Sequence, residues 1–318
     1  MSATTVQTVE AQEEHRRGVL YGTAAYVLWG LFPLYWVLLK PAGAVEVLAH
    51  RIVWSLVAVL AVLWLVAWRR AQPVLPAVLR DRRRLALLAM AAVFISVNWG
   101  TYIWGVTHGH VVETSLGYFI NPLVTVLAGV LVLGERLRPW QWAAVGFGAV
   151  AVVVLTVGYG RPPWIALTLA FSFGTYGLIK KYVGTGAVES LAVETTVLLV
   201  PALAYLVVLE AGGGGTMFDH GAGHAALLAT GGVVTAIPLL AFGAAANRVP
   251  LSLLGLLQYL APVLQLAVGV LLFGEHMPAV RWFGFTLVWL ALAVLTWDGL
   301  RAARRRGRAA AVEPCEPT

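Results

Sequence analysis

Four ionisable residues lie inside apolar stretches that are long enough to cross a membrane. They are His50, Arg51, Glu113 and Glu194. Charged side chains at membrane depth are costly, so they usually pair with one another or face a water-filled cavity on a substrate or proton path. For the set as a whole, fastening between helices and contact with a substrate or proton both stay open. For His50 taken alone, packing or hydrogen bonding is favoured.

Helix rise indicates which of these charges meet. Arg51 lies about 10 Å inside the start of its stretch, and Glu113 lies early in a later stretch, in the same outer half. We therefore expect Arg51 to pair with Glu113. Glu194 lies in the opposite half, too far in depth for Arg51. Its expected partners stand at the inner ends of the stretches: Lys180, Lys181 or Arg248.

A second polar set falls near the middle of the apolar stretches. Its members are Asn98, Tyr102, Tyr118, Asn121, Gln258, Tyr259 and Gln265. Pro122 and Pro262 lie among them, and a proline inside a helix frees the carbonyl four residues earlier. Such carbonyls are tolerated best beside a cavity. We expect this set to line a substrate cavity, and ordinary kinks sealed by neighbouring side chains are the alternative.

The composition places these residues in an all-α polytopic membrane protein. Of the 318 residues, 60% are hydrophobic and 12% are charged, and the mean hydropathy is +0.81. Soluble proteins carry about 25% charged residues, whereas a spanning helix needs about 20 mostly apolar ones. The lone Cys315 excludes an internal disulfide. Ten transmembrane helices are predicted at 18–39, 45–68, 85–107, 111–133, 140–159, 163–180, 189–209, 224–246, 251–273 and 278–299.

The chain contains an internal duplication. Residues 118–157 and 258–297 align without a gap and are identical at 11 of 40 positions, and 43–49 matches 186–192 at six of seven. Two five-helix repeats, 18–159 and 163–299, follow from this. Five is an odd number, so the repeats enter the membrane from opposite faces and cup a central cavity as inverted repeats. The remaining segments are 1–17, expected to be loose, and a basic tail, 300–318.

Each copy contains a Gly-Glu pair between two helices, Gly134-Glu135 and Gly274-Glu275. A glycine at a helix end permits the left-handed residue that closes many helices. The glutamate begins the run into the next helix, whose N-terminal dipole favours a negative charge. We expect a structural role for both glutamates.

Lysine and arginine fix the expected orientation. Eighteen of them fall on one side of the ten spans and three on the other, with Arg51 inside a span. Cytoplasmic loops carry the excess, so both termini are predicted to be cytoplasmic, and the glycine-rich loop 211–223 to be flexible and external. The net charge of +7 reflects this topology rather than nucleic-acid binding, because the basic runs have no interleaved aromatic residues.

Several segments resemble the RarD group, in the EamA branch of the drug/metabolite transporter superfamily. They are 25–35 (AYVLWGLFPLY), 46–55 (EVLAHRIVWS), 172–181 (SFGTYGLIKK) and the Asn121-Pro122 helix that ends in Gly134-Glu135. The resemblance covers roughly residues 18–299. It implies a ten-span bacterial inner-membrane carrier with inverted five-helix repeats. The group's usual label, chloramphenicol-sensitive, implies drug handling without establishing it. The second copy has Ala261 where the first has Asn121. Any role of the Asn121 amide is therefore confined to one side of the axis that relates the two copies.

The expected function is secondary transport of a small organic metabolite or drug-like solute by alternating access, with efflux favoured only by the resemblance. No phosphate-binding glycine loop, metalloprotease motif or nucleophile elbow occurs, so we expect no enzyme activity, no ATP coupling, no metal and no cofactor. An uncoupled facilitator and a non-transporting scaffold or sensor remain the alternatives. Substrate identity, proton coupling and a homodimer stay open.

Overall fold

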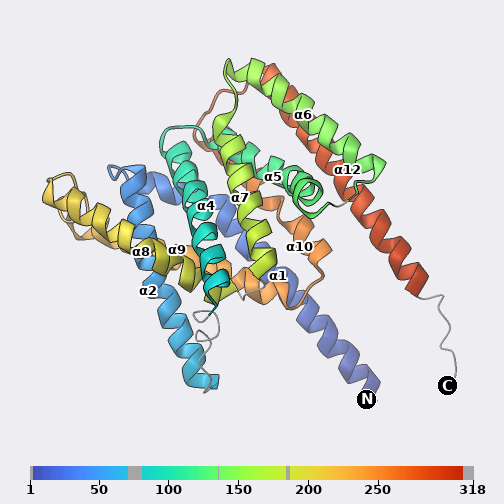
Figure 1. The fold of residues 1–318 in the computed structure, drawn as a ribbon, viewed down its shortest axis with the longest axis horizontal. Helices are drawn as coiled ribbons and strands as arrows, with labels where there is room; N and C mark the ends of the chain where they lie inside the picture. The colour runs from blue at the N-terminus through green and yellow to red at the C-terminus, as the bar shows by residue number, and fades with distance from the viewer. Residues whose placement is uncertain (1–2, 71–80, 135, 184–186, 311–318) are drawn as a thin grey trace.

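The computed structural model describes residues 3–70, 81–134, 136–183 and 187–310, and every regular element within them is helical (Figure 1). The helices of the first half are α1 (Ala3–Leu38), α2 (Ala44–Arg70), α4 (Arg82–Thr107), α5 (Val111–Leu133) and α6 (Pro139–Tyr159). Those of the second half are α7 (Trp164–Val183), α8 (Ala187–Ala211), α9 (Gly221–Ala246), α10 (Leu251–Leu257), α11 (Leu260–Ala267), the π-helix η1 (Val268–Leu272) and α12 (Ala279–Ala310).

Nine helices within the described residues are long and apolar enough to cross a membrane, and Trp164–Lys180 is a shorter apolar one. They fall on the ten predicted stretches to within a few residues. Local chemistry sets several ends. The side chain of Asp81 accepts from the N–H groups of Arg83 and Arg84 at the start of α4, and left-handed Gly134 and Gly160 close α5 and α6.

Three predicted elements differ from the observed ones. The last predicted span, 278–299, continues as α12 to Ala310, into the segment predicted as a basic tail. Residues 1–17 were expected to be loose, but α1 begins at Ala3 and continues into the first span. Polarity indicates exposure, and no Pro or Gly interrupts this stretch before Gly18, so nothing stops the helix. The predicted single helix 251–273 is divided into α10, α11 and η1, with Gln258 and Tyr259 at the first break.

The helices pack in a connected set of pairs. α1 lies against α9 and α11, α7 against α4 and α5, α2 against α8 and α9, and α4 against α8. α5 also packs on α11, and α6 lies along α12 at one edge of the molecule (Figure 1). One apolar cluster joins α5, α6 and α12 around Phe119, Leu155 and Phe285, and a second joins α1, α4 and α7 around Trp36 and Leu169.

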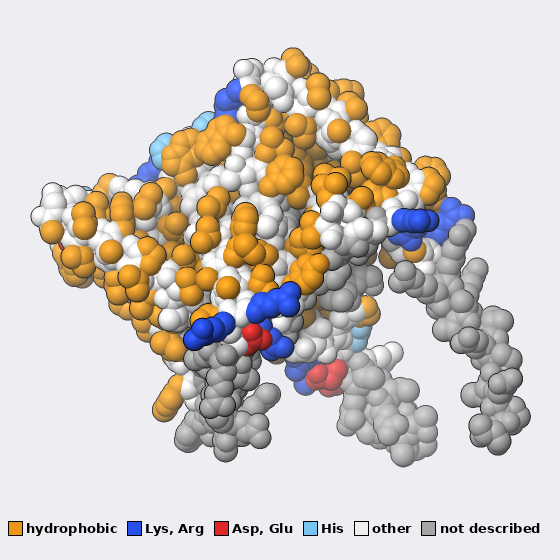
Figure 2. Space-filling model, viewed as in Figure 1, with side chains coloured by type: hydrophobic (Ala, Val, Ile, Leu, Met, Phe, Trp, Pro, Cys, Tyr) orange, Lys and Arg blue, Asp and Glu red, His pale blue; other side chains and the backbone are white. Residues whose placement is uncertain are grey.

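Apolar side chains also cover the outside of the bundle. Leu131, Val153, Val157, Val200 and Leu271 are each at least 65% exposed, which suits contact with lipid. Figure 2 shows apolar side chains over most of the drawn face, with Lys and Arg gathered mainly near the lower edge, where the termini end. The described protein is therefore a polytopic membrane protein by composition and by surface.

Candidate functional site

Arg51 is buried on α2 and surrounded by aromatic rings. Only 4% of the surface of this residue is exposed. The guanidinium carbon lies 3.9 Å from the ring centroid of Trp99 on α4 and 5.1 Å from that of Trp36 on α1. On its other side, Nε donates to the Thr235 hydroxyl of α9 at 3.0 Å. The charge is thus held between helices of both predicted repeats.

A close approach of two backbones brings Thr235 to Arg51. A Cβ on Gly232 of α9 would lie 2.1 Å from the carbonyl oxygen of Trp54, and one on Gly231 would lie 3.9 Å from the Arg51 Cα. A side chain at Gly232 therefore has no room, and α9 can lie directly on α2. Thr235 stands one helical turn beyond Gly231, on the face that meets the guanidinium.

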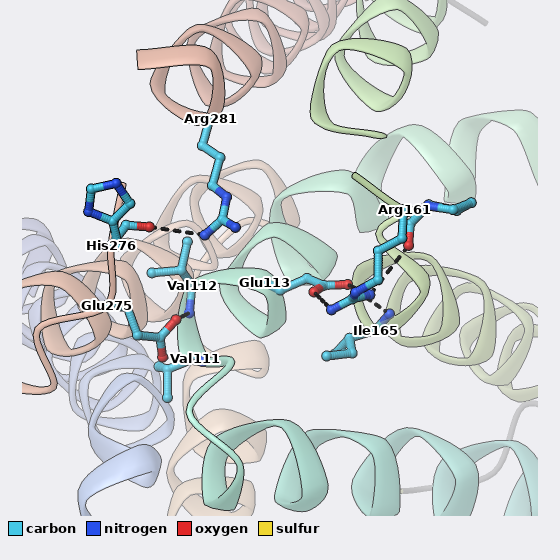
Figure 3. A network of polar contacts seen from close by, with 9 residues as sticks. Val111, Val112, Glu113, Arg161, Ile165, Glu275, His276 and Arg281 are labelled. Carbon is cyan, nitrogen blue, oxygen red and sulfur yellow. Dashed lines mark hydrogen bonds and ion pairs between the residues drawn. The ribbon is translucent and has the colours of Figure 1, made fainter. Parts of the chain in front are cut away.

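The expected pair between Arg51 and Glu113 does not form. Glu113 instead receives Arg161, whose Nη2 lies 2.8 Å from Oε2, and the N–H of Ile165, at 3.1 Å from Oε1 (Figure 3). Rise along single helices gave Arg51 and Glu113 similar depths, but it carried no information on which helices touch. α2 packs on α4, α8 and α9, whereas α5 packs on α7 and α11.

Glu113 and Glu275 serve as caps for helix starts at the same end of the molecule. Glu113 satisfies the free N–H of Ile165 at the start of α7, and Glu275 accepts from the N–H groups of Val111 and Val112 at the start of α5 (Figure 3). Sequence reasoning assigned Glu275 to the helix after it, α12. Its carboxylate reaches α5 instead, because η1 packs closely on the start of α5. A Cβ built on Gly269 of η1 would lie only 3.2 Å from the Val112 nitrogen. Glu135 lies outside the described residues.

The environment of this cap shifts two titrating groups. Burial raises the pKa of the Glu275 carboxyl above its ordinary value, and the N–H groups of Val112 and Val111 oppose that rise. Burial lowers the pKa of the nearby His110, and the charge of Glu113 opposes that fall. Arg281 stacks on Tyr159 at 4.0 Å and donates to the His276 carbonyl at 2.9 Å (Figure 3).

Glu194 has one of its expected partners. Lys180 Nζ lies 3.0 Å from Oε1, the Tyr176 hydroxyl donates to Oε2 at 3.2 Å, and Ser190 donates to Oε1 at 2.9 Å. Lys180 also donates to Ser190. The prediction of a Lys180–Glu194 pair is thus confirmed. Because all of the carboxylate's neighbours lie on α7 and α8, the pair fastens those two helices at one end.

Three members of the predicted midplane set lie together between α4, α5 and α7. Asn98 donates to the Leu169 carbonyl at 3.0 Å, and the Tyr118 hydroxyl donates to Asn98 Oδ1 at 3.4 Å. The Tyr102 and Tyr118 rings meet edge to face with centroids 5.7 Å apart. Tyr102 and Asn98 are both buried. The Tyr102 hydroxyl, although buried, has no hydrogen-bond partner.

The other midplane residues spread over two faces. Asn121 Oδ1 is buried without a partner, close to where a Cβ on Gly174 would lie. Gln265 donates to the Trp29 carbonyl at 3.1 Å and leaves its own oxygen unpaired. Gln258 is half-buried at the α10–α11 break. Tyr259 packs against the cluster of α5, α6 and α12, away from Asn98. The structure therefore gathers part of the set, and leaves Tyr259 apart.

His50 stands next to a polar cluster that sequence reasoning missed. Its Nε2 is buried without a partner. One turn earlier, Glu46 accepts from the N–H and hydroxyl of Thr216, at 2.7 and 2.9 Å, and that hydroxyl contacts His224 Nε2 at 2.8 Å. These contacts anchor the glycine-rich loop that was expected to be only flexible. Glu46 lies in the repeated segment 43–49, so a signal for it was present in the sequence.

Trp36, Trp99, Thr235 and Arg161 were also missed as partners. The sequence of an apolar helix does not indicate which of its aromatic rings will pack on a cation. Arg161 lies in a loop, where a positive charge indicates topology rather than a partner. Among the described residues, no group of three or more His, Cys, Asp or Glu side chains is placed to hold a metal ion.

Comparison with known proteins identifies the family. The model of the EamA-like transporter family matches residues 16–157. The chain is 62% identical over 308 residues to "Protein RarD" of Streptomyces exfoliatus, covering 96% of each chain. This chain belongs to the RarD group of the EamA-like transporters.

Other relatives support the same assignment. The chain is 40% identical to "Uncharacterized transporter YojE" of Bacillus subtilis over 92% of its length and 97% of the relative, and 33% identical to "Chloramphenicol-sensitive protein RarD" of Pseudomonas aeruginosa over 92% and 97%. A solved crystal structure aligns with a TM-score of 0.57 at 20% identity, over 90% of this chain and 98% of that one, which speaks for the fold alone. The RarD relatives are bacterial, and other relatives are named as transporters. The chain is a multi-pass membrane transporter of this type.

Proposed function

We propose that the chain is a secondary transporter that moves a small organic solute by alternating access between two inverted five-helix units. The observation that carries this is the exchange symmetry of the helix contacts. When α1, α2, α4, α5 and α6 are exchanged for α7, α8, α9, α11 and α12, the pairs α1–α9, α1–α11 and α2–α9 become α7–α4, α7–α5 and α8–α4.

Each of these exchanged pairs is itself a packed pair, and α2–α8, α5–α11 and α6–α12 map onto themselves. Two equivalent halves that cross-pack in this way have two arrangements of similar energy, related by a pseudo-two-fold axis in the membrane plane and each open to one side. The residues between the halves would then contact the solute. Arg51, Asn98, Tyr102, Tyr118, Asn121 and Gln265 lie on α2, α4, α5 and α11, which take part in these pairs.

An untargeted metabolite comparison tests the function. Cells that lack the protein and cells that overproduce it are compared for solutes in the cytoplasm and the medium, with Asn121→Ala at equal protein level as a third arm. We expect at least one small organic solute to shift in opposite senses in the cells that lack the protein and the cells that overproduce the wild type. The shift caused by overproduction should vanish with Asn121→Ala. No reciprocal shift of any solute would favour the scaffold or sensor.

The direction and the coupling follow from the same cells. Once a solute is found, its gradient is measured before and after addition of a proton uncoupler. A coupled transporter holds the solute away from equilibrium, so the gradient collapses when the proton gradient does. A facilitator without coupling brings the solute only to electrochemical equilibrium. Its end point does not respond to the uncoupler for a neutral solute, and for an anion it follows the membrane potential alone.

A further inference from the structure

We propose that Arg51 binds the anionic group of the transported solute, which is therefore a small organic acid with an apolar or aromatic body. This inference rests on the proposed transport function and names its substrate class. Its starting point is a buried cation that has no counter-ion among the residues the structure describes.

A guanidinium stays protonated in proteins, so burial does not neutralise Arg51. Taking such a charge out of water is costly unless an opposite charge and hydrogen-bond acceptors replace the lost hydration. Arg51 offers five N–H donors, and one of them, at Nε, has an acceptor, the Thr235 hydroxyl. The described chain supplies the other four with no hydrogen-bond acceptor.

The carboxylates of the bundle are engaged elsewhere. Glu46 is held by Thr216, Glu113 by Arg161, and Glu194 by Lys180. Glu275 caps α5 and Asp298 lies 2.6 Å from Arg138. Each of these contacts lies at a helix end or between neighbouring helices. The charge of Arg51 is thus left for a group that comes from outside the chain.

Two groups in the surroundings of Arg51 can donate a hydrogen bond and have no partner in the described chain. Trp36 Nε1, whose ring lies beside the guanidinium, is buried without a partner, as is the Tyr102 hydroxyl. Tyr118, Tyr102 and Tyr35 also lie near Arg51, and each carries a neutral hydroxyl rather than a negative charge. An acceptor-rich ligand satisfies such a set, and a carboxylate or phosphate has that chemistry without adding a donor.

The ring contacts define how the ligand approaches. Trp99 lies over the guanidinium at 3.9 Å, and Nε is turned to Thr235, so a face and one edge are occupied. The two Nη groups form the remaining edge, and a carboxylate binds such an edge with two parallel hydrogen bonds. Phe32, Trp36, Tyr102 and Tyr118 supply aromatic surface around it, which suits an apolar body.

The metabolite comparison described above tests this assignment when Arg51→Gln, Arg51→Lys and Arg248→Gln are added at equal protein level. Arg248→Gln is the matched control, because it removes one positive charge at the end of α9. We expect the solutes moved by the wild type to be carboxylates or phosphates, Arg51→Gln to lose their transport, and Arg248→Gln to keep it. Arg51→Lys keeps the positive charge but loses the two parallel N–H donors of the guanidinium, so we expect weaker transport of the same anions.

Binding to the purified full chain provides an independent arm. Benzoate, phenylacetate and hexanoate are each compared with their own amide in nanodiscs of zwitterionic lipid, through the shift in unfolding temperature. We expect at least one acid to bind about tenfold or more tightly than its amide, which is about 1.4 kcal/mol, and Arg51→Gln to erase the difference. Competition by added phosphatidylglycerol would identify a lipid phosphate as the occupant and overturn the solute assignment.

Three outcomes separate the failures. If the wild type moves no solute, the proposed transport function fails first. If it moves neutral or cationic solutes, or if Arg51→Gln moves anions as well as the wild type does, transport stands and the role of Arg51 is overturned. If Arg51→Gln loses transport only together with a fall of several degrees in unfolding temperature, Arg51 is a fastener. An unpaired cation predicts an equal or higher temperature, since the variant removes a desolvation cost.

Discussion

At the scale of single residues, two buried charges on helices that do not pack against each other have opposite surroundings. Glu113, 1% exposed, has a bidentate arginine and a backbone N–H, whereas Arg51 has one hydroxyl and three rings. The positions of both were predictable, because a charge in an apolar run is visible in the sequence. Their partners were not, since Arg161 comes from a turn 48 residues away and the rings carry no formal charge.

Removing Arg161 should cost more than removing both members of its pair. Arg161→Ala leaves the Glu113 carboxylate buried with its charge uncompensated, and we expect a loss of roughly 2–3 kcal/mol, at the low end for a broken buried pair because Arg161 is partly exposed. Adding Glu113→Ala should restore part of that stability. The measurement is thermal unfolding of the purified variants.

A matched double-mutant cycle combines Glu113→Ala with Arg51→Ala, because the side chains of these two residues do not touch. Those two effects should add within about 0.5 kcal/mol. Strict additivity for Arg161 and Glu113, or strong coupling between Arg51 and Glu113, would contradict the observed pairing.

Solvent access to the midplane is testable at Asn121 and Gln258, both half-buried. With Cys315→Ser as background, a cysteine at either position should react with a hydrophilic thiol reagent, because a thiol must ionise in water to react. Val153→Cys, at a residue 65% exposed on the outer face of α6, should stay unreactive in lipid. Val152 is no substitute control, because it packs against the core. Inert cysteines at both test positions would indicate interhelical packing instead of a cavity.

At the scale of elements, the two helices that contain the repeat-matched prolines behave differently. α5 runs unbroken through Pro122, whereas the helix with Pro262 is split at Gln258 and passes into η1. The sequence placed matched prolines at matched positions, and it could not say which kink would open. η1 and Gly269 bring the second copy close to the start of α5, so Glu275 caps a helix of the first half. That contact depends on tertiary packing, which a repeat pattern does not encode.

The cap predicts a pH dependence of stability with a defined sign. Burial raises the folded-state pKa of Glu275 above the ordinary value of 4.5, so the folded chain holds this proton more tightly than the unfolded chain does. The resulting stabilisation is complete below that ordinary value and is lost as pH rises through the raised pKa.

Glu275→Gln lacks this titration. We therefore expect the unfolding temperature of the wild type, relative to that of Glu275→Gln, to rise as pH falls from neutral towards 4.5. Leu131→Gln, which adds an amide on the exposed surface, serves as a control without an effect on the slope. A wild-type advantage that instead grows with rising pH would contradict the buried cap.

At the scale of the whole molecule, the sequence predicted the membrane class and nearly every helix, because length and hydropathy decide both. The structure adds which helices meet, and the exchange symmetry of those contacts extends to pairs, such as α1–α9 and α4–α7, that lie outside the matched repeat segments. The start of α1 and the end of α12 lie towards the same edge of the molecule, the lower one in Figure 1.

Reporter fusions test the orientation of this arrangement. A reporter after Arg84 should report the cytoplasm, and one within Gly212–Gly215 should report the exterior, because the positively charged connections stay inside. The anchoring of Thr216 to Glu46 makes the second site a sensitive one, so fusion proteins are first checked for normal abundance. Both reporters on one side would exclude ten spans in the proposed order.

The lengths of the first and last helices have a consequence for how deeply the protein sits. α1 has 36 residues and α12 has 32, so at 1.5 Å per residue they measure about 54 and 48 Å, against a hydrocarbon core of about 30 Å. Both helices are therefore long enough to extend well past the acyl chains. We expect Arg16 on α1 and Arg301 on α12 to lie in the headgroup layer, where a basic side chain gains about 1 kcal/mol from anionic lipid. We therefore expect membranes rich in anionic lipids to hold the helix bundle at a fixed depth in the bilayer.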